Sequence, residues 1–137
     1  MSEAVRGWIS DHWSDVVTTQ TPRIGLAVDD HERVIELLSR RLGEFFDQFY
    51  GATNPADAEA ILAAHPVTHL VCDFDLGDEH PVGTYLVQKW RSQYPGIERA
   101  IIHSGAQRSM IPTIPEVDDI LSKPASIFAL KTALHIK

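Results

Sequence analysis

The sequence has a single cysteine, Cys72, no excess of basic residues and no long apolar run. One cysteine cannot form an internal disulfide, and zinc sites built from thiolates need more of them. Lysine and arginine number 12 against 19 aspartate and glutamate residues, a formal net charge of −7. We expect no nucleic-acid-binding surface, because no basic patch is available to neutralise phosphates. No apolar stretch approaches the ~20 residues of a membrane-spanning helix, and the acidic, tryptophan-bearing N-terminus is unlike a signal peptide, so we predict a cytoplasmic protein.

Short apolar segments alternate with helical patterns along the chain, and 44% of the residues are hydrophobic, as in an ordinary globular domain. The apolar segments predict strands over residues 23–28, 46–52, 68–73, 99–104 and 118–124. Helices are predicted over residues 31–45, 54–65, 82–94 and 126–136. Asn54 and Ser126 are the expected N-caps of two of them, and Pro112 with Pro115 should shorten any helix between the last two strands. This alternation predicts an α/β fold with a parallel sheet.

An amphipathic pattern precedes the first strand. Residues 2–17 place large apolar side chains on one side at helical spacing, namely Val5, Trp8, Ile9, Trp13, Val16 and Val17. Residues 18–22 form a short linker, so we divide the chain into an N-terminal helix with its linker, 1–22, and a domain, 23–137. The tryptophan stripe either packs against its own domain or forms a homodimer or partner interface.

Polar residues follow four of the predicted strands at the points where they end. They are Asp29 and Asp30 after the first strand, Asp73 after the third, Ser104 after the fourth and Lys123 after the fifth. In open parallel sheets ligands bind beyond the carboxyl ends of the strands, so these side chains should converge on one edge. Three carboxylates there favour a hard divalent cation, and Mg²⁺ suits a site that also takes phosphate. Asp73 can then act as a nucleophile that becomes an acyl phosphate.

This set of residues, in this order, resembles the receiver domain of two-component response regulators, the CheY-like superfamily. The resemblance covers residues 23–136 and implies a flavodoxin-like, doubly wound sheet of five strands, preceded here by an extra helix. It implies that Asp73 takes a phosphoryl group from a sensor histidine kinase or a phosphotransfer protein. It also implies that Asp30, Asp73 and the backbone carbonyl of Asp75 hold Mg²⁺, with Asp29 acting directly or through water. Ser104 and Lys123 would contact the phosphoryl group. Such a protein is a signalling switch and not a conventional enzyme.

Two other interpretations compete with this one. Asp73-Phe74-Asp75, followed by Ser104 and Lys123, also resembles the site of a haloacid-dehalogenase-type phosphohydrolase, in which Asp75 would be the acid/base. That interpretation gives the Asp29–Asp30 pair no role, and the short tail after Lys123 lacks the acids that hold the metal in that family. The third interpretation is a degenerate receiver that only binds partners.

Some features depart from the receiver pattern and motivate the third interpretation. Ile120 stands three positions before Lys123, where receivers usually carry Tyr or Phe, so the usual aromatic side chain is missing. The loop after Asp73 is lengthened and runs through Asp78–His80 to Gly83, which opens the next helix. His31 is assigned to the surface by default, and because it directly follows the acid pair, where the resemblance implies contact with the kinase, it is a candidate for a modest role in partner specificity. The remaining isolated histidines are assigned to the surface by default, namely His12, His65, His69 and His135. The chain is either a stand-alone regulator or the receiver of a longer one.

Overall fold

The computed structural model describes residues 21–137, and the predicted N-terminal helix lies outside the described residues. The five predicted strands are all present and form one sheet in the order β2-β1-β3-β4-β5. All four neighbouring pairs are parallel. The strands are β1 (Ile24–Val28), β2 (Gln48–Ala52), β3 (His69–Cys72), β4 (Arg99–Ser104) and β5 (Asp119–Ser122). This is the strand order of the flavodoxin-like fold that was predicted.

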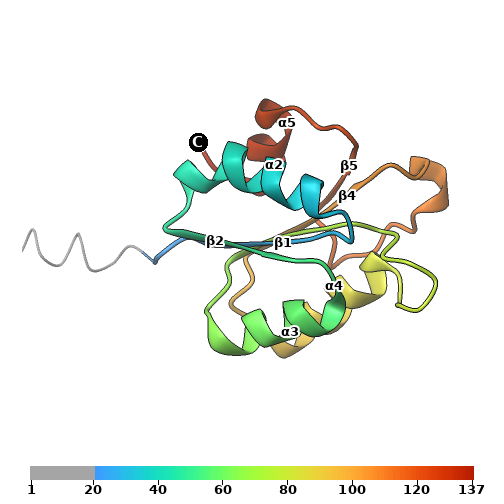
Figure 1. Ribbon diagram of the computed structural model, residues 1–137, viewed down its shortest axis with the longest axis horizontal. Coiled ribbons are helices and arrows are strands. Elements are labelled where there is room, and N and C mark those ends of the chain that lie inside the picture. The colour runs from blue at the N-terminus through green and yellow to red at the C-terminus, as the bar shows by residue number, and fades with distance from the viewer. Residues whose placement is uncertain (1–20) are drawn as a thin grey trace, which may run out of the picture.

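Helices cover both faces of the sheet (Figure 1). On one face lie α2 (Glu32–Leu42), which continues into the short 3₁₀ turn η1 (Gly43–Phe45), and α5 (Ile127–Leu134). On the other face lie α3 (Pro55–Ala64) and α4 (Gly83–Gln93). Each face has its own core, because successive strand residues point to opposite sides. Leu70 and Cys72 of β3 belong to the core beneath α3 and α4, whereas Val71 belongs to the core beneath α2 and α5.

The helices begin where the sequence predicts. The Asn54 side chain accepts a hydrogen bond from the Asp57 amide at 2.8 Å, and Pro55 occupies the first helical position. The Ser126 side chain accepts one from the Ala129 amide at 3.0 Å and so caps α5. None of the helices in the described part of the chain is long and apolar enough to cross a membrane.

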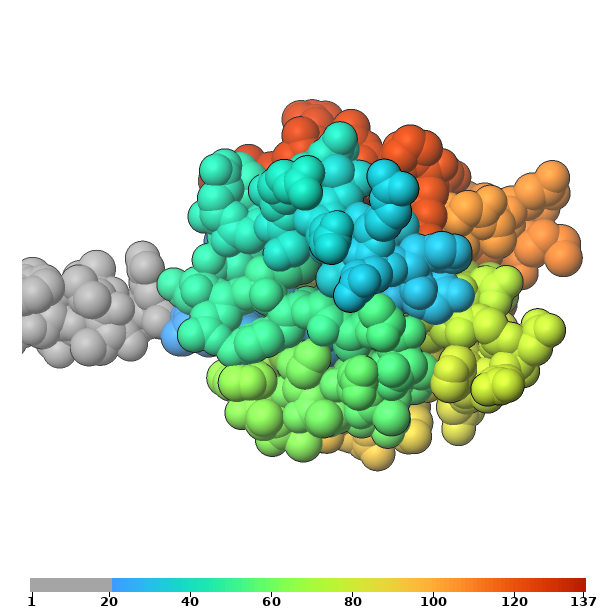
Figure 2. Space-filling view, in the orientation of Figure 1, coloured from blue at the N-terminus to red at the C-terminus, as the bar shows by residue number. Residues whose placement is uncertain are grey.

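The connection from β4 to β5 contains only one 3₁₀ turn, η2 (Arg108–Met110), in place of a full helix between these strands. This agrees with the prediction from Pro112 and Pro115, which remove amide donors and block helix propagation. The segment projects beyond the carboxyl end of the sheet, as does the loop that follows β3 (Figures 1 and 2). Both loops project from the edge of the sheet on which the predicted site residues lie.

One prediction about single residues is wrong. His69 was assigned to the surface, but it is only 6% exposed and lies at the start of β3. Its Nδ1 atom is 2.7 Å from the Thr68 hydroxyl, and its ring meets that of Phe46 edge-on at 5.4 Å between centroids. The pattern around it misled the prediction because a polar residue at a strand end usually reaches solvent, whereas here the ring packs against Phe46. Cys72, in contrast, is fully buried as predicted.

Candidate functional site

Hydrogen bonds that continue the sheet by one residue bring the predicted site residues together. The Asp29 amide donates to the Ala52 carbonyl at 3.1 Å, and the Asp73 amide donates to the Val28 carbonyl at 2.9 Å. The Lys123 amide donates to the Ser104 carbonyl at 2.9 Å. Because the strands are parallel, these extensions all lie at the carboxyl edge of the sheet. These backbone hydrogen bonds therefore fix the main-chain positions of Asp29, Asp73 and Lys123.

Lys123 joins two of the carboxylates. Its ammonium nitrogen lies 2.7 Å from Asp29 Oδ2 and 3.0 Å from Asp73 Oδ2. Asp29 and Asp73 are 2% and 5% exposed, so both carboxylates have lost most of their contact with water. Burial lowers the pKa of Lys123, but the hydrogen bonds and charges of Asp29 and Asp73 outweigh it, and the pKa is raised overall. The ammonium therefore remains charged at any physiological pH.

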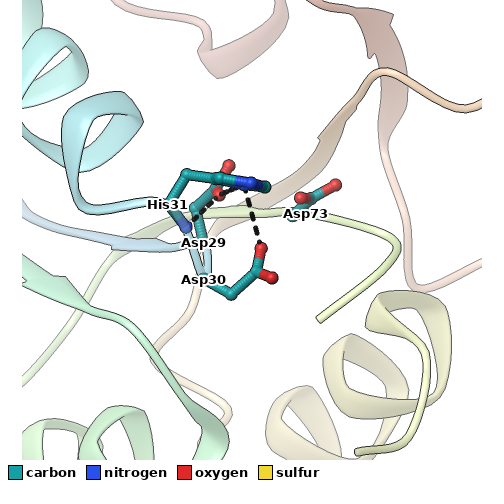
Figure 3. A group of neighbouring side chains, drawn as sticks. All are labelled: Asp29, Asp30, His31 and Asp73. Atoms are coloured by element: carbon teal, nitrogen blue, oxygen red, sulfur yellow. Dashed lines mark hydrogen bonds and ion pairs between the residues drawn. The ribbon is translucent and has the colours of Figure 1, made fainter. Parts of the chain in front are cut away.

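Asp30 and His31 complete a compact cluster with Asp29 and Asp73 (Figure 3). His31 Nδ1 lies 3.2 Å from Asp30 Oδ1 and 3.4 Å from Asp29 Oδ1, and the His31 amide donates to Asp29 Oδ1 at 2.9 Å. Each of the four residues offers a ligand atom, and these atoms all lie within 4.8 Å of one another. Sequence reasoning placed His31 at the surface, with a modest role in partner specificity, and missed its place in this cluster. Its position directly after the acid pair was the available signal.

The charges and donor types of this cluster fit a divalent cation. Three carboxylates, those of Asp29, Asp30 and Asp73, face the single ammonium of Lys123, which leaves two negative charges uncompensated among these groups. Carboxylate oxygens are the ligands that hard ions such as Mg²⁺ and Ca²⁺ prefer. The side chains present can therefore hold a divalent metal ion.

The cluster opens into a depression of about 640 Å³ at the carboxyl edge of the sheet. Ser104 and Lys123 line it together with Asp30 and Asp73, so the four predicted side chains share one space. Ser104 is buried, and its Oγ accepts a hydrogen bond from the Ala106 amide at 3.1 Å. The loop after β3 forms the outer wall through Gly77 and Asp78.

The carboxylate of Asp75 is used locally. It accepts a hydrogen bond from the Gly77 amide at 3.0 Å and is exposed, and Gly77 adopts a positive φ of 105°. This short turn redirects the chain after β3. The Asp75 side chain lies outside the cluster of Figure 3, so its contribution would come from its backbone.

Gly83 places the first turn of α4 directly on the backbone of the site. Its amide donates to the Phe74 carbonyl at 2.7 Å. A Cβ atom at this position would overlap the carbonyl oxygen of Asp73, so no other residue fits without moving α4. The glycine that opens the helix therefore has a packing role at the site itself.

His103 and Ile120 lie beneath the site in the core. His103 is buried, its Nε2 accepts a long hydrogen bond from the Ala125 amide at 3.4 Å, and its Nδ1 has no hydrogen-bond partner among the described residues. Burial lowers the pKa of His103, and the nearby Lys123 charge lowers it further, so the ring is neutral. Ile120 is also buried and packs with Ile111 and Val117 of the irregular segment before β5.

The fold matches solved structures of receiver domains. The signal receiver domain of an HD domain-containing protein from Pseudomonas fluorescens Pf-5 is 24% identical, with a TM-score of 0.73 over 84% of this chain and 93% of that one. A CheY-like response-regulator receiver domain from Methylobacillus flagellatus is 21% identical, with a TM-score of 0.71 over 84% and 98%. A response regulator from Burkholderia pseudomallei, solved with a phosphorylated aspartic acid, calcium ion and citrate, is 22% identical, with a TM-score of 0.67 over 82% of this chain and 66% of that one.

At the level of sequence alone no family model matches this chain, and neither does any curated protein. The structural matches therefore carry the comparison. The chain has the flavodoxin-like fold of CheY-like receiver domains, as predicted, with a cluster of aspartates at the carboxyl edge of its sheet.

Proposed function

We propose that this chain is a phosphoacceptor switch of a two-component phosphorelay, in which Asp73 receives a phosphoryl group from a sensor histidine kinase or a histidine phosphotransfer protein. The observation that carries the proposal is the contact of the Lys123 ammonium with both Asp29 and Asp73, in a depression that also exposes Asp30. A buried carboxylate next to a fixed cation and a second acid is suited to hold a phosphoryl group and its counter-ion together.

In this reaction the chain's own groups supply the nucleophile and the fixed charge. A carboxylate oxygen of Asp73 forms a bond to phosphorus while the phosphorus–nitrogen bond of the donor breaks. The donor imidazole keeps the electron pair of that bond and takes up a proton. Lys123, already within 3.0 Å of Asp73, would follow the new phosphoryl oxygens, and the Ser104 hydroxyl would donate a hydrogen bond to one of them.

The proposed metal is Mg²⁺, held by Asp30, Asp73 and the backbone carbonyl of Asp75, with Asp29 acting directly or through water. When bound, the ion would neutralise charge on the transferring phosphoryl group. The chain contributes the position of these oxygens: Asp73 and Asp29 are fixed by the sheet, and Asp75 is fixed by the turn that its own carboxylate closes on Gly77.

The phosphohydrolase interpretation finds less support in the site. It needs the Asp75 carboxylate as a general acid beside Asp73, but that group is exposed and bonded to the Gly77 amide. It also gives no role to Asp29, which is the closest carboxylate to Lys123. The phosphoacceptor interpretation gives a role to both residues: Asp29 contacts Lys123 beside the metal, and the turn at Asp75 positions its backbone carbonyl.

The experiment is phosphorylation by a small donor. The protein is incubated with Mg²⁺ and acetyl phosphate or phosphoramidate, and intact mass is measured. We expect a gain of one phosphoryl group that is stable in acid and labile in base, and that is absent from Asp73→Asn. Asp75→Asn is the matched control and should still be modified.

Three results would point elsewhere. Rapid turnover of the donor that collapses in Asp75→Asn would favour the phosphohydrolase. Absence of modification with every donor, a cognate kinase included, would favour the degenerate receiver. Modification that persists in Asp73→Asn would show that another residue is the acceptor.

A further inference from the structure

The cluster of Figure 3 contains one imidazole, that of His31, which offers a nitrogen atom where the other three residues offer carboxylate oxygens. The His31 side chain is 71% exposed, yet its ring turns back from solvent. Its Nδ1 atom lies 3.2 Å from Asp30 Oδ1 and 3.4 Å from Asp29 Oδ1. Both distances are longer than the ~2.9 Å that is usual for an N–H···O hydrogen bond. The ring therefore lies over the two acids without a short hydrogen bond to either of them.

Main-chain contacts hold His31 in this place. Its amide donates to Asp29 Oδ1 at 2.9 Å, and its carbonyl accepts a hydrogen bond from the Val34 amide at 3.0 Å. It is the residue directly before α2, with an extended backbone at φ −98° and ψ 109°. Its side chain makes no hydrogen bond that caps the helix. The backbone therefore presents the ring to the acids, and the ring itself is not required to start α2.

The four ligand atoms of the cluster are close enough together for a single ion to bind them. They lie within 4.8 Å of one another. Two ligands on opposite sides of a divalent ion are ~4.2 Å apart, because each bond is ~2.1 Å long. A small inward movement of the side chains would therefore suffice. His31 also lines the depression that contains Asp30, Asp73 and Asp75, so its imidazole faces the space in which the proposed ion would bind.

An imidazole ligand changes which ions a site favours. Carboxylates and carbonyl groups suit Mg²⁺, Ca²⁺ and Mn²⁺, whereas imidazole suits transition metals such as iron, nickel, copper and zinc. Mg²⁺ gives up its bound water reluctantly and prefers oxygen ligands, so it gains little from a nitrogen atom. A neutral ring also adds a donor atom without adding to the repulsion among the carboxylates of Asp29, Asp30 and Asp73. The imidazole would therefore stabilise a bound transition-metal ion much more than a bound Mg²⁺.

We propose that His31 is a ligand of the bound ion through Nδ1, together with Asp30 and Asp73, and that it gives this site a preference for divalent transition-metal ions over Mg²⁺. This inference rests on the proposed function, because it assigns a further ligand to the metal site of the phosphoacceptor. The two can fail separately, since the carboxylates can bind Mg²⁺ without help from the imidazole.

Metal affinities of the full chain test the proposal. Mg²⁺ and Co²⁺ are titrated separately by calorimetry into the wild type and His31→Ala, at about pH 7.5 because imidazole binds metals in its neutral form. Co²⁺ is the transition-metal probe because it binds more weakly than Ni²⁺ or Cu²⁺, so isolated surface histidines interfere less. We expect His31→Ala to weaken Co²⁺ binding by about tenfold or more and to leave Mg²⁺ binding nearly unchanged. His80→Ala, which removes an exposed histidine from the loop after β3, is the matched control and should change neither affinity.

A second measurement separates direct ligation from a general change at the site. An imidazole bound to Co²⁺ gives proton NMR resonances far outside the normal range, because the unpaired electrons of the ion shift them. We expect such resonances in the wild type and in His80→Ala, and their absence from His31→Ala. Asp30→Asn should weaken the binding of both ions, because it removes a carboxylate that either ion would use.

Three results would overturn the proposal. Equal Co²⁺ affinities in the wild type and His31→Ala, with Mg²⁺ binding intact, would exclude the ligand role and leave the phosphoacceptor proposal standing. Equal weakening of Co²⁺ and Mg²⁺ binding in His31→Ala would show that the residue supports the site as a whole and confers no selectivity. Absence of binding of either ion to the wild type would overturn the metal site itself, and this proposal with it.

Discussion

The buried His69 should make this protein lose stability as the pH falls below 6.5. The ring is almost inaccessible to water and lies between Thr68 and Phe46. Burial, reinforced by the charges of Arg23 and Arg99, lowers the pKa of His69 from 6.5 to about 4. The folded protein therefore keeps the ring neutral at a pH where the unfolded chain protonates it.

The sign and size of the effect follow from this difference. Between pH 6.5 and about 4 the unfolded state binds a proton that the folded state does not, so the free energy of unfolding decreases as the pH falls. The stabilisation is fully present above pH 6.5 and fully lost below about pH 4. At about 1.4 kcal/mol for each pH unit, the loss is about 2 kcal/mol at pH 5 and about 3 kcal/mol when complete.

The assay measures the free energy of unfolding in urea for the wild type and for His69→Gln, at several pH values from about 7.5 to about 5. The difference between the two proteins isolates His69, because all other titrating groups contribute equally to both. We expect the wild type to lose about 2 kcal/mol more than the variant over this range. His80→Gln, in the exposed loop after β3, should behave as the wild type. A constant difference between wild type and His69→Gln across the range would refute the reasoning. An imidazole NMR titration of His69 with a midpoint near pH 6.5 would refute it as well.

Three further substitutions test the packing and the charges of the site. Gly83→Ala should cost about 1–3 kcal/mol in urea unfolding and slow phosphorylation, because the new methyl group meets the Asp73 carbonyl; Gly96→Ala, with no atom within 4 Å, is the control. Lys123→Met should slow phosphoryl transfer by about a hundredfold yet tighten Mg²⁺ binding in calorimetry, since the competing ammonium is gone; weaker Mg²⁺ binding would contradict this. Asn54→Ala should cost about 1 kcal/mol through the lost cap of α3, whereas an unchanged urea midpoint would show that the cap is dispensable.

The sheet and its carboxyl edge could be predicted because several independent local signals agree. Apolar segments marked the strands, Asn54-Pro55 and Ser126 marked helix starts, and the polar residues stood at the ends of four strands or within two positions after them. Parallel pairing then leaves only one edge on which those residues can meet. Asp29, Asp73 and Lys123 are in direct contact although 94 positions separate the first from the last.

The features that sequence reasoning missed depend on contacts that no local pattern encodes. His69 is buried at the start of β3, where its ring packs against that of Phe46, a residue distant in sequence. His31 turns back on the acid pair because its own amide is fixed by Asp29. The Asp75 carboxylate accepts a hydrogen bond from the Gly77 amide. This role could not be predicted, because it depends on a turn with positive φ at Gly77 that only the structure shows.

The two faces of the sheet differ in how they can present a surface to another protein. The connection between β4 and β5 contains one 3₁₀ turn in place of a full helix. Ile120 packs there with Ile111 and Val117, so this irregular segment fills the space beside β5 that a helix and an aromatic ring would occupy. The face covered by α2 and α5 carries the exposed ring of Phe128, on α5. Lys123 is connected to α5 by only three residues, ending in the capping Ser126, so any shift of the lysine at the site acts first on that helix. If Asp73 is phosphorylated as proposed, we expect contacts with other proteins to change first on the α2/α5 face.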